Sequence, residues 1–221
     1  MPLGSGKNGA AVAFDPRLGY YYAVFAGNED FPLSMFNSTG QPIDTFSSAG
    51  FDARGLWYNP ESGDLEGNGY GDAGIMILTR DEDGRPEYAD WASYLFSPPD
   101  DNSSVCFDTS KKAFVYYVGG MLFFYGYESS LQEKGISVDD IILQNINATT
   151  CIYTGIPEAE FGLLDFATRR ILLLNREGKM TRSLPLPANA PAPERFNFSY
   201  CNGHFWLFNM ETRTWMGYKL K

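Results

Sequence analysis

The feature that most constrains the fold of this sequence is an internal repeat of about 45 residues. The first copy contains "VAFDPRLGYYYAVFAGNEDFPLSMFNSTGQPIDTF" from Val12, which predicts four short strands separated by turns. The first-strand anchors of the successive copies are Phe14, Tyr58, Phe107 and Ile152, with a fifth copy near Phe198. A four-stranded unit of this length cannot bury both of its faces until neighbouring copies stack on it, which is typical of a β-propeller blade.

Turns and composition support the same interpretation. The connection before the fourth strand of a copy reads "NSTG", "DEDG" and "NREG", which suits hairpins that need a left-handed residue. The chain contains 17 Phe and 14 Tyr, and such rings favour pleated surfaces over helices. The sequence therefore predicts an all-β protein, a five-bladed β-propeller with about four antiparallel strands per blade.

The repeat also predicts the domain organisation. Residues 1–9 are expected to form an N-terminal tail or tag remnant, and residues 10–221 a single propeller domain. The predicted blades span approximately residues 10–50, 51–99, 100–146, 147–190 and 194–221. The fifth copy ends after its third strand, so the last blade is expected to be incomplete.

The unit from Val12 resembles an NHL-type propeller repeat. In that repeat a small-aliphatic strand ending in Asp is followed by an aromatic strand, a polar loop, an apolar strand and a hairpin. The resemblance extends from about Ala10 to Leu220. It implies a relative of the six-bladed, TolB-type propeller superfamily, with five copies in this chain.

Charge and composition limit the partners. The net charge of −10 repels phosphate backbones, so no nucleic-acid partner is expected. No apolar run approaches the length of a membrane span, so no membrane insertion is expected, and the predicted protein is a soluble, acidic monomer. Four Asn-x-Ser/Thr sequons slightly favour an extracytoplasmic or secreted location.

Few residues offer catalytic chemistry. His204 is the sole histidine and is expected at the start of a strand, so triads and two-histidine metal sites are disfavoured. Cys106 and Cys151 are assigned to one repeat position and interpreted as small packing residues; with Cys201 they are expected to be free thiols. The sequence leaves open whether the protein is an enzyme and favours a binding module.

The predicted binding surface is a rim of loops. Connections between second and third strands, and between blades, meet on one face of a propeller, where function is usually located. The residues expected on this rim are Asn28, Asp30, Phe31, Asp52, Arg54, Trp57, Asp72, Arg170, Arg195, Arg213 and Trp215. Aromatic and charged groups together suit a protein, peptide or glycan partner.

Two alternatives accompany this hypothesis. Asp52, Asn102 and Asn147 precede the first strands of their copies and are candidate oxygen ligands for calcium, and the sequence indicates no other cofactor. With such an ion the protein would be a calcium-dependent propeller hydrolase or lactonase with an Asn/Asp-lined channel. The other alternative is a structural segment of a larger secreted protein.

Overall fold

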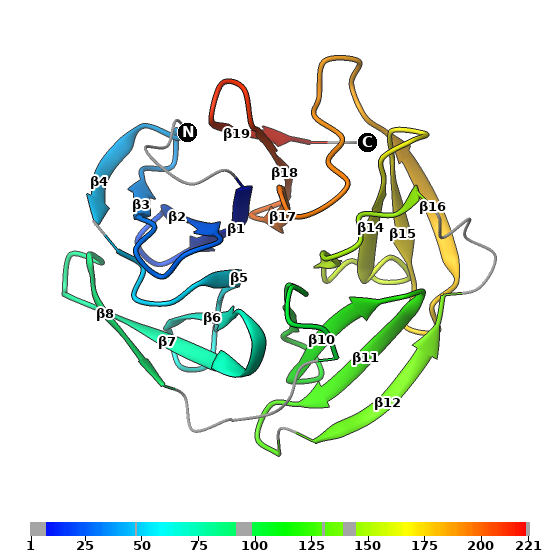
Figure 1. Ribbon diagram of the computed structural model, residues 1–221, viewed down its shortest axis with the longest axis horizontal. Coiled ribbons are helices and arrows are strands. Elements are labelled where there is room, and N and C mark those ends of the chain that lie inside the picture. Colours follow the sequence, from blue (N-terminus) through cyan, green and yellow to red (C-terminus); the bar gives the residue numbers. More distant parts are fainter. Residues whose placement is uncertain (1–7, 47, 92–98, 130, 139–144, 220–221) are drawn as a thin grey trace.

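A computed structural model describes residues 8–46, 48–91, 99–129, 131–138 and 145–219 of the chain. Five small antiparallel sheets are arranged in a ring around a central axis, as Figure 1 shows. Each sheet is a meander in which strands follow one another in chain order. The predicted all-β, five-bladed β-propeller is confirmed.

The blades are defined by the following strands. Blade 1 consists of β1 (Asn8–Asp15), β2 (Tyr20–Ala26), β3 (Leu33–Phe36) and β4 (Pro42–Phe46). Blade 2 consists of β5 (Ala53–Tyr58), β6 (Leu65–Gly69), β7 (Ile75–Arg80) and β8 (Pro86–Trp91), with the 3-10 turn η1 (Gly71–Ala73) before β7. Blade 3 consists of β9 (Cys106–Asp108), β10 (Ala113–Val118), β11 (Met121–Gly126) and β12 (Gln132–Ser137). Blade 4 consists of β13 (Ile152–Tyr153), β14 (Phe161–Asp165), β15 (Arg170–Leu174) and β16 (Met180–Pro185). Blade 5 consists of β17 (Phe198–Cys201), β18 (His204–Asn209) and β19 (Thr214–Tyr218).

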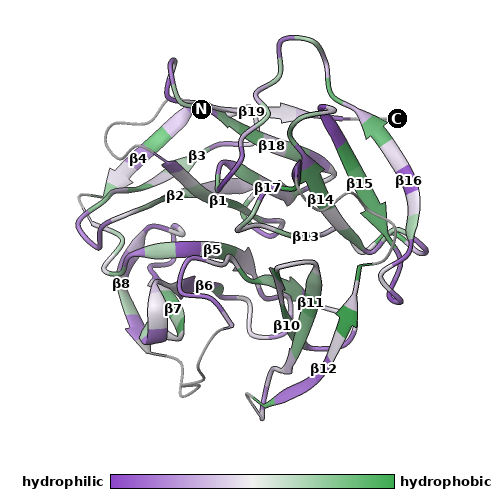
Figure 2. Cartoon of the chain, turned by 45° about the vertical axis from the view of Figure 1, so that its right-hand side comes forward, coloured by the Kyte–Doolittle hydropathy of each residue, from purple (hydrophilic) through white to green (hydrophobic). Residues whose placement is uncertain are grey.

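The core lies between the blades. The described residues form an apolar cluster in each of the five spaces between adjacent blades. Strands such as β15 are apolar on both faces because a neighbouring blade covers each face, whereas the outer strand β16 is largely exposed. Figure 2 shows this contrast, with β14 and β15 mostly green and β16 paler and more purple.

Asx turns begin several of the hairpins. The carboxylate Oδ1 of Asp15 accepts the backbone N–H of Arg17, and that of Asp108 accepts those of Ser110 and Lys111. These short polar side chains stabilise the turn by capping backbone donors two or three residues ahead. The sequence signals "FDP" and "FDT" therefore mark the ends of the innermost strands.

The predicted register of blade 4 is wrong by one residue. Ser104 and Thr150 form a parallel bridge, which places Tyr153, and not Ile152, level with Phe107. The two cysteines, Cys106 and Cys151, therefore do not occupy equivalent positions in their blades, although the sequence suggests it. Successive side chains of a strand point to opposite faces, so a slip of one residue reverses which neighbouring blade each side chain contacts.

The ring closes between blade 5 and blade 1 without a fourth strand in the described part of blade 5. β1 begins at Asn8, inside the segment predicted to be a tail. The backbone N–H of Asn197 donates to the carbonyl of Gly9 at 2.8 Å, and the N–H of Gly9 donates to the Asn197 side-chain oxygen at 2.7 Å. Further along the same strands, the Ser199 hydroxyl bonds both the N–H and the carbonyl of Val12. These backbone and side-chain hydrogen bonds join the two ends of the ring.

Candidate functional site

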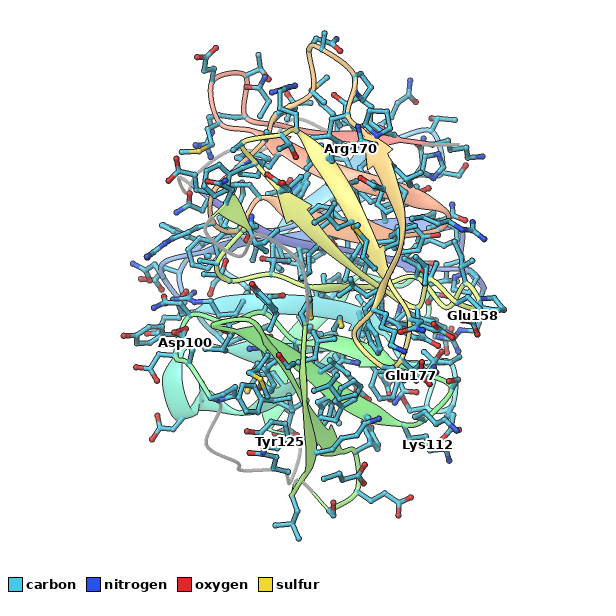
Figure 3. The ribbon with its side chains drawn as sticks, turned by 90° about the vertical axis from the view of Figure 1, so that its right-hand side faces the viewer. Asp100, Lys112, Tyr125, Glu158, Arg170 and Glu177 are labelled. Atoms are coloured by element: carbon cyan, nitrogen blue, oxygen red, sulfur yellow. The ribbon has the colours of Figure 1, made fainter. Side chains whose placement is uncertain are left out.

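The propeller has two faces that differ in their connections. We call the face formed by the second-to-third-strand and inter-blade connections the loop face, and the opposite face, formed by the other hairpin turns, the turn face. The side view in Figure 3 shows Lys112, Glu158 and Glu177 at the turn face and Asp100 at the opposite end. The predicted rim corresponds to the loop face.

The structure distributes the predicted rim residues unevenly. Asn28, Asp30, Asp72 and Arg195 are exposed on the loop face, and Phe31 is half-buried against Phe25. Two of the arginines contact other side chains of the propeller, Arg170 within blade 4 and Arg213 between blades 5 and 1. Arg170 donates to the hydroxyl and carbonyl of Ser183, and the Arg213 guanidinium lies 5.4 Å from the centroid of the Phe25 ring.

Neither tryptophan predicted on the rim lies there. Trp57 packs between blades 2 and 3, where its indole N–H donates to Glu66 at 3.0 Å. Trp215 is 1% exposed and packs between blades 5 and 1 against Phe208. Both rings belong to the core because large aromatics bury more apolar area than the loops can offer them.

Asp52 and Arg54 bind each other. The Asp52 carboxylate accepts two hydrogen bonds from the Arg54 guanidinium, at 2.5 and 3.1 Å, and a third from the N–H of Gly27. Arg54 is the extra residue of a β-bulge in β5: Ala53 and Gly55 on either side of it pair with successive residues of β6. Its side chain is almost fully buried. A bulge on an innermost strand redirects its side chain, here toward the axis.

Arg54 reaches across the axis. Its guanidinium lies 5.5 Å from the centroid of the Phe196 ring, which precedes blade 5, a blade not adjacent to blade 2. On its own blade the same group lies 4.8 Å from the centroid of the Tyr70 ring. Stacked cationic and aromatic groups of this kind attract each other. Arg54 and Phe196 therefore meet across the axis near the loop face.

The other two candidate metal ligands hold backbone segments. The side-chain amide of Asn147 is fully buried and donates to the carbonyls of Pro193 and Phe196, at 3.0 and 2.9 Å. Asn102 lies in a turn in which its N–H donates to the Asp100 carboxylate. Among the described residues there is no cluster of three or more His, Cys, Asp or Glu side chains that could hold a metal ion.

The site that sequence reasoning missed is a pocket on the axis. It has a volume of about 410 Å³ and is formed by the innermost strands of all five blades. Exposed Pro16, Pro60 and Thr109, in the turns after the first strands, lie at its mouth on the turn face. The pocket therefore opens on the face opposite to the predicted rim.

Each blade contributes an aromatic residue at the same position of its innermost strand to the lining of this pocket. The five equivalent residues are Phe14, Tyr58, Phe107, Tyr153 and Tyr200, and Trp57 and Phe198 also border the pocket. Phe107 is buried and the other four equivalent residues are half-buried. None of the residues that line the pocket is Asp, Glu, Lys, Arg or His. The sequence contains an indication of this pocket, because most of these aromatic residues are the anchors of the repeat or lie next to them.

Buried ion pairs surround the pocket at the turn face. Arg80 of blade 2 donates to the Asp15 carboxylate of blade 1 at 2.6 Å, and Arg176 of blade 4 pairs with Asp108 of blade 3. Burial alone would raise the pKa of each carboxyl, but hydrogen bonds from the arginines and the turn outweigh burial and hold both pKa values below the ordinary range. These charges join adjacent blades, and none of the four residues lines the pocket.

Comparison with solved structures finds the same fold in other proteins. The crystal structure of a glutaminyl cyclase of Myxococcus xanthus matches with a TM-score of 0.63 and 12% identity, over 94% of this chain and 88% of that one. An auxiliary nutrient binding protein of Bacteroides thetaiotaomicron VPI-5482 matches with a TM-score of 0.53 and 12% identity, over 95% and 68%. No family model and no curated protein match the sequence.

The chain therefore belongs to the structural class of β-propellers, and the aromatic-lined axial pocket is its candidate site. At 12% identity the likeness shows the fold alone. No helix in the described ranges is long and apolar enough to cross a membrane.

Proposed function

We propose that this protein is a binding propeller that takes up a small, uncharged molecule with an aromatic or aliphatic body in its axial pocket. The observation that carries the proposal is the aromatic residue that each of the five blades contributes to one pocket. Apolar and aromatic walls with few polar groups are typical of small-molecule sites of this volume.

The uncharged lining supports the choice of ligand. A charged ligand entering the pocket would lose its hydration without gaining an opposite charge among the lining residues. An uncharged ring gains favourable contacts with the edges and faces of the surrounding aromatic side chains. The hydroxyl groups of Tyr58, Tyr153 and Tyr200 can supply a few hydrogen bonds at the periphery.

Binding is favoured over catalysis for the same reason. General acid–base or nucleophilic catalysis needs a titratable group within hydrogen-bond reach of the reacting atom. The titratable side chains among the lining residues are thiols and phenols, and burial raises the pKa of Cys106 and Tyr200, which keeps both groups protonated at neutral pH. Proteins of this fold include a glutaminyl cyclase and a nutrient binding protein, so the fold is compatible with either class.

Binding of N-phenyl-1-naphthylamine, an uncharged aromatic probe, tests the proposal. We expect saturable one-to-one binding by equilibrium dialysis. Replacing Thr109, at the mouth, by tryptophan is expected to weaken it at least about tenfold, because the larger side chain narrows the opening.

The matched control is Thr212→Trp, which introduces the same side chain at an exposed position on the loop face. We expect it to leave the affinity unchanged. Non-saturable uptake, or equal weakening by both variants, would show that the probe does not occupy the axial pocket.

The loop face remains the predicted docking surface for a protein, peptide or glycan, and calcium at Asp52, Asn102 and Asn147 remains the alternative. For calcium to bind there, Asp52 would have to leave Arg54, and the side-chain oxygen of Asn147 would have to leave the N–H and hydroxyl of Thr149. We therefore expect about 1 mM calcium, enough to fill extracellular calcium modules, to raise the melting temperature by less than about 1 °C. A larger, chelator-reversible rise that is lost in Asp52→Asn would support the calcium hydrolase instead.

A further inference from the structure

Two cysteine side chains of adjacent blades meet in the wall of the axial pocket. Cys106 begins β9 of blade 3, and Cys151 immediately precedes β13 of blade 4. Their sulfur atoms are 3.4 Å apart, and both residues line the pocket. The third cysteine, Cys201, also borders the pocket, but it packs against the cluster between blades 5 and 1.

The register of the inner strands explains this meeting. Cys106 and Cys151 occupy neighbouring, not equivalent, positions in their blades, so their side chains point toward each other into the same inter-blade space. Equivalent residues would both face the same way around the ring and would not meet. A disulfide needs a sulfur separation of about 2.05 Å, so an approach of roughly 1.4 Å completes it.

We propose that Cys106 and Cys151 are a redox modification site, forming a reversible disulfide between blades 3 and 4 when a hydroperoxide enters the axial pocket. The thiolate of one cysteine attacks the peroxide oxygen and gives a sulfenic acid, releasing an alcohol or water. The second thiolate attacks that sulfur, the S–S bond forms as the S–OH bond breaks, and the hydroxide leaves as water with the proton that the second thiol has lost. The two thiols are oxidised by two electrons, the peroxide is reduced, and an external dithiol reverses the change.

Burial sets the speed of this reaction. The apolar surroundings and the neighbouring Cys151 raise the pKa of Cys106 well above its usual value, so little thiolate exists at neutral pH. The pair therefore oxidises slowly and responds to a sustained oxidising environment. The rate is expected to rise with pH, since the thiolate is the nucleophile.

Peptide mapping of the oxidised native protein tests the proposal. The reduced protein is incubated with hydrogen peroxide, its remaining thiols are blocked with iodoacetamide during unfolding, and the digest is analysed by mass spectrometry. We expect a linked peptide pair containing Cys106 and Cys151, cleaved by dithiothreitol, with Cys201 alkylated. The bond closes a span of 45 residues, so the oxidised protein should melt about 5–10 °C higher than the reduced one.

Serine variants identify the residues responsible. Cys106→Ser is expected to fold, since Ser199 and Ala13 occupy the equivalent position in blades 5 and 1, and to lose both the linked peptide and the melting shift. Cys151→Ala is expected, independently, to lose the linked peptide and the melting shift as well. Cys201→Ser is the matched control and should retain both effects. Alkylation of all three cysteines after peroxide, or a link that involves Cys201, would overturn the proposal.

Discussion

Replacing Trp215 by alanine is expected to lower the free energy of unfolding by about 3–5 kcal/mol, the usual cost of truncating a large buried aromatic. Trp215 is fully buried where blade 5 meets blade 1, and its ring lies directly against the backbone of Gly9. In the described part of the chain no strand ladder joins the two sheets, and the single backbone bond from Asn197 to Gly9 does not replace the lost apolar contact. Urea denaturation followed by far-UV circular dichroism measures the effect.

Two controls separate this role from the rim function predicted from the sequence. Trp215→Phe retains part of the apolar contact and should cost clearly less than Trp215→Ala. Met210→Ala, an exposed position in the preceding loop, should change the free energy of unfolding by less than about 0.5 kcal/mol. A Trp215→Ala protein that is as stable as the wild type but has lost a binding partner would restore the rim hypothesis for this residue.

Replacing Arg80 by methionine is expected to cost about 3–5 kcal/mol at neutral pH, because it leaves the Asp15 carboxylate buried without its closest cation. The side chains of Arg80 and Asp15 are 6% and 0% exposed, and Arg80 also donates to the carbonyl of Gly63. Combining Arg80→Met with Asp15→Asn should recover part of the loss, since Asn59 occupies the same turn position in blade 2.

The pH dependence of this effect follows from the pKa of Asp15. The pKa of Asp15 in the folded protein lies below its unfolded value of about 3.9. The ion pair therefore stabilises the folded protein fully above about pH 3.9, and this stabilisation is lost as the pH falls through the folded-state pKa. The difference between wild type and Arg80→Met should therefore shrink below about pH 4. Arg85→Met is the control: Arg85 is 47% exposed beside three carboxylates and should cost under about 0.5 kcal/mol. Equal costs at positions 80 and 85 would contradict the argument.

The fold was predictable because its information is periodic. Anchors such as Phe14 and Phe107, with an Asx turn after each, recur at intervals that only stacked small sheets satisfy. The comparisons confirm the propeller class, whereas the NHL type stays a prediction. The register of blade 4 failed because two cysteines make a persuasive but false alignment when the period varies between copies.

The site was less predictable because it depends on which way side chains turn at the axis. Sequence patterns indicate which face carries the long loops, and these loops do lie there. They do not show that Arg54 sits on a bulge and turns inward to Phe196, or that Trp57 is needed between blades. The pocket arises from the sum of five equivalent rings, which a search for isolated motifs passes over.

The Arg54 guanidinium and the Phe196 ring meet across the axis near the loop face, whereas the pocket has its mouth at the turn face. We therefore expect a guest to enter and leave at the turn face, so that its residence time depends on that one opening. A second molecule bound on the loop face is then separated from the guest, and the two surfaces are free to acquire different tasks.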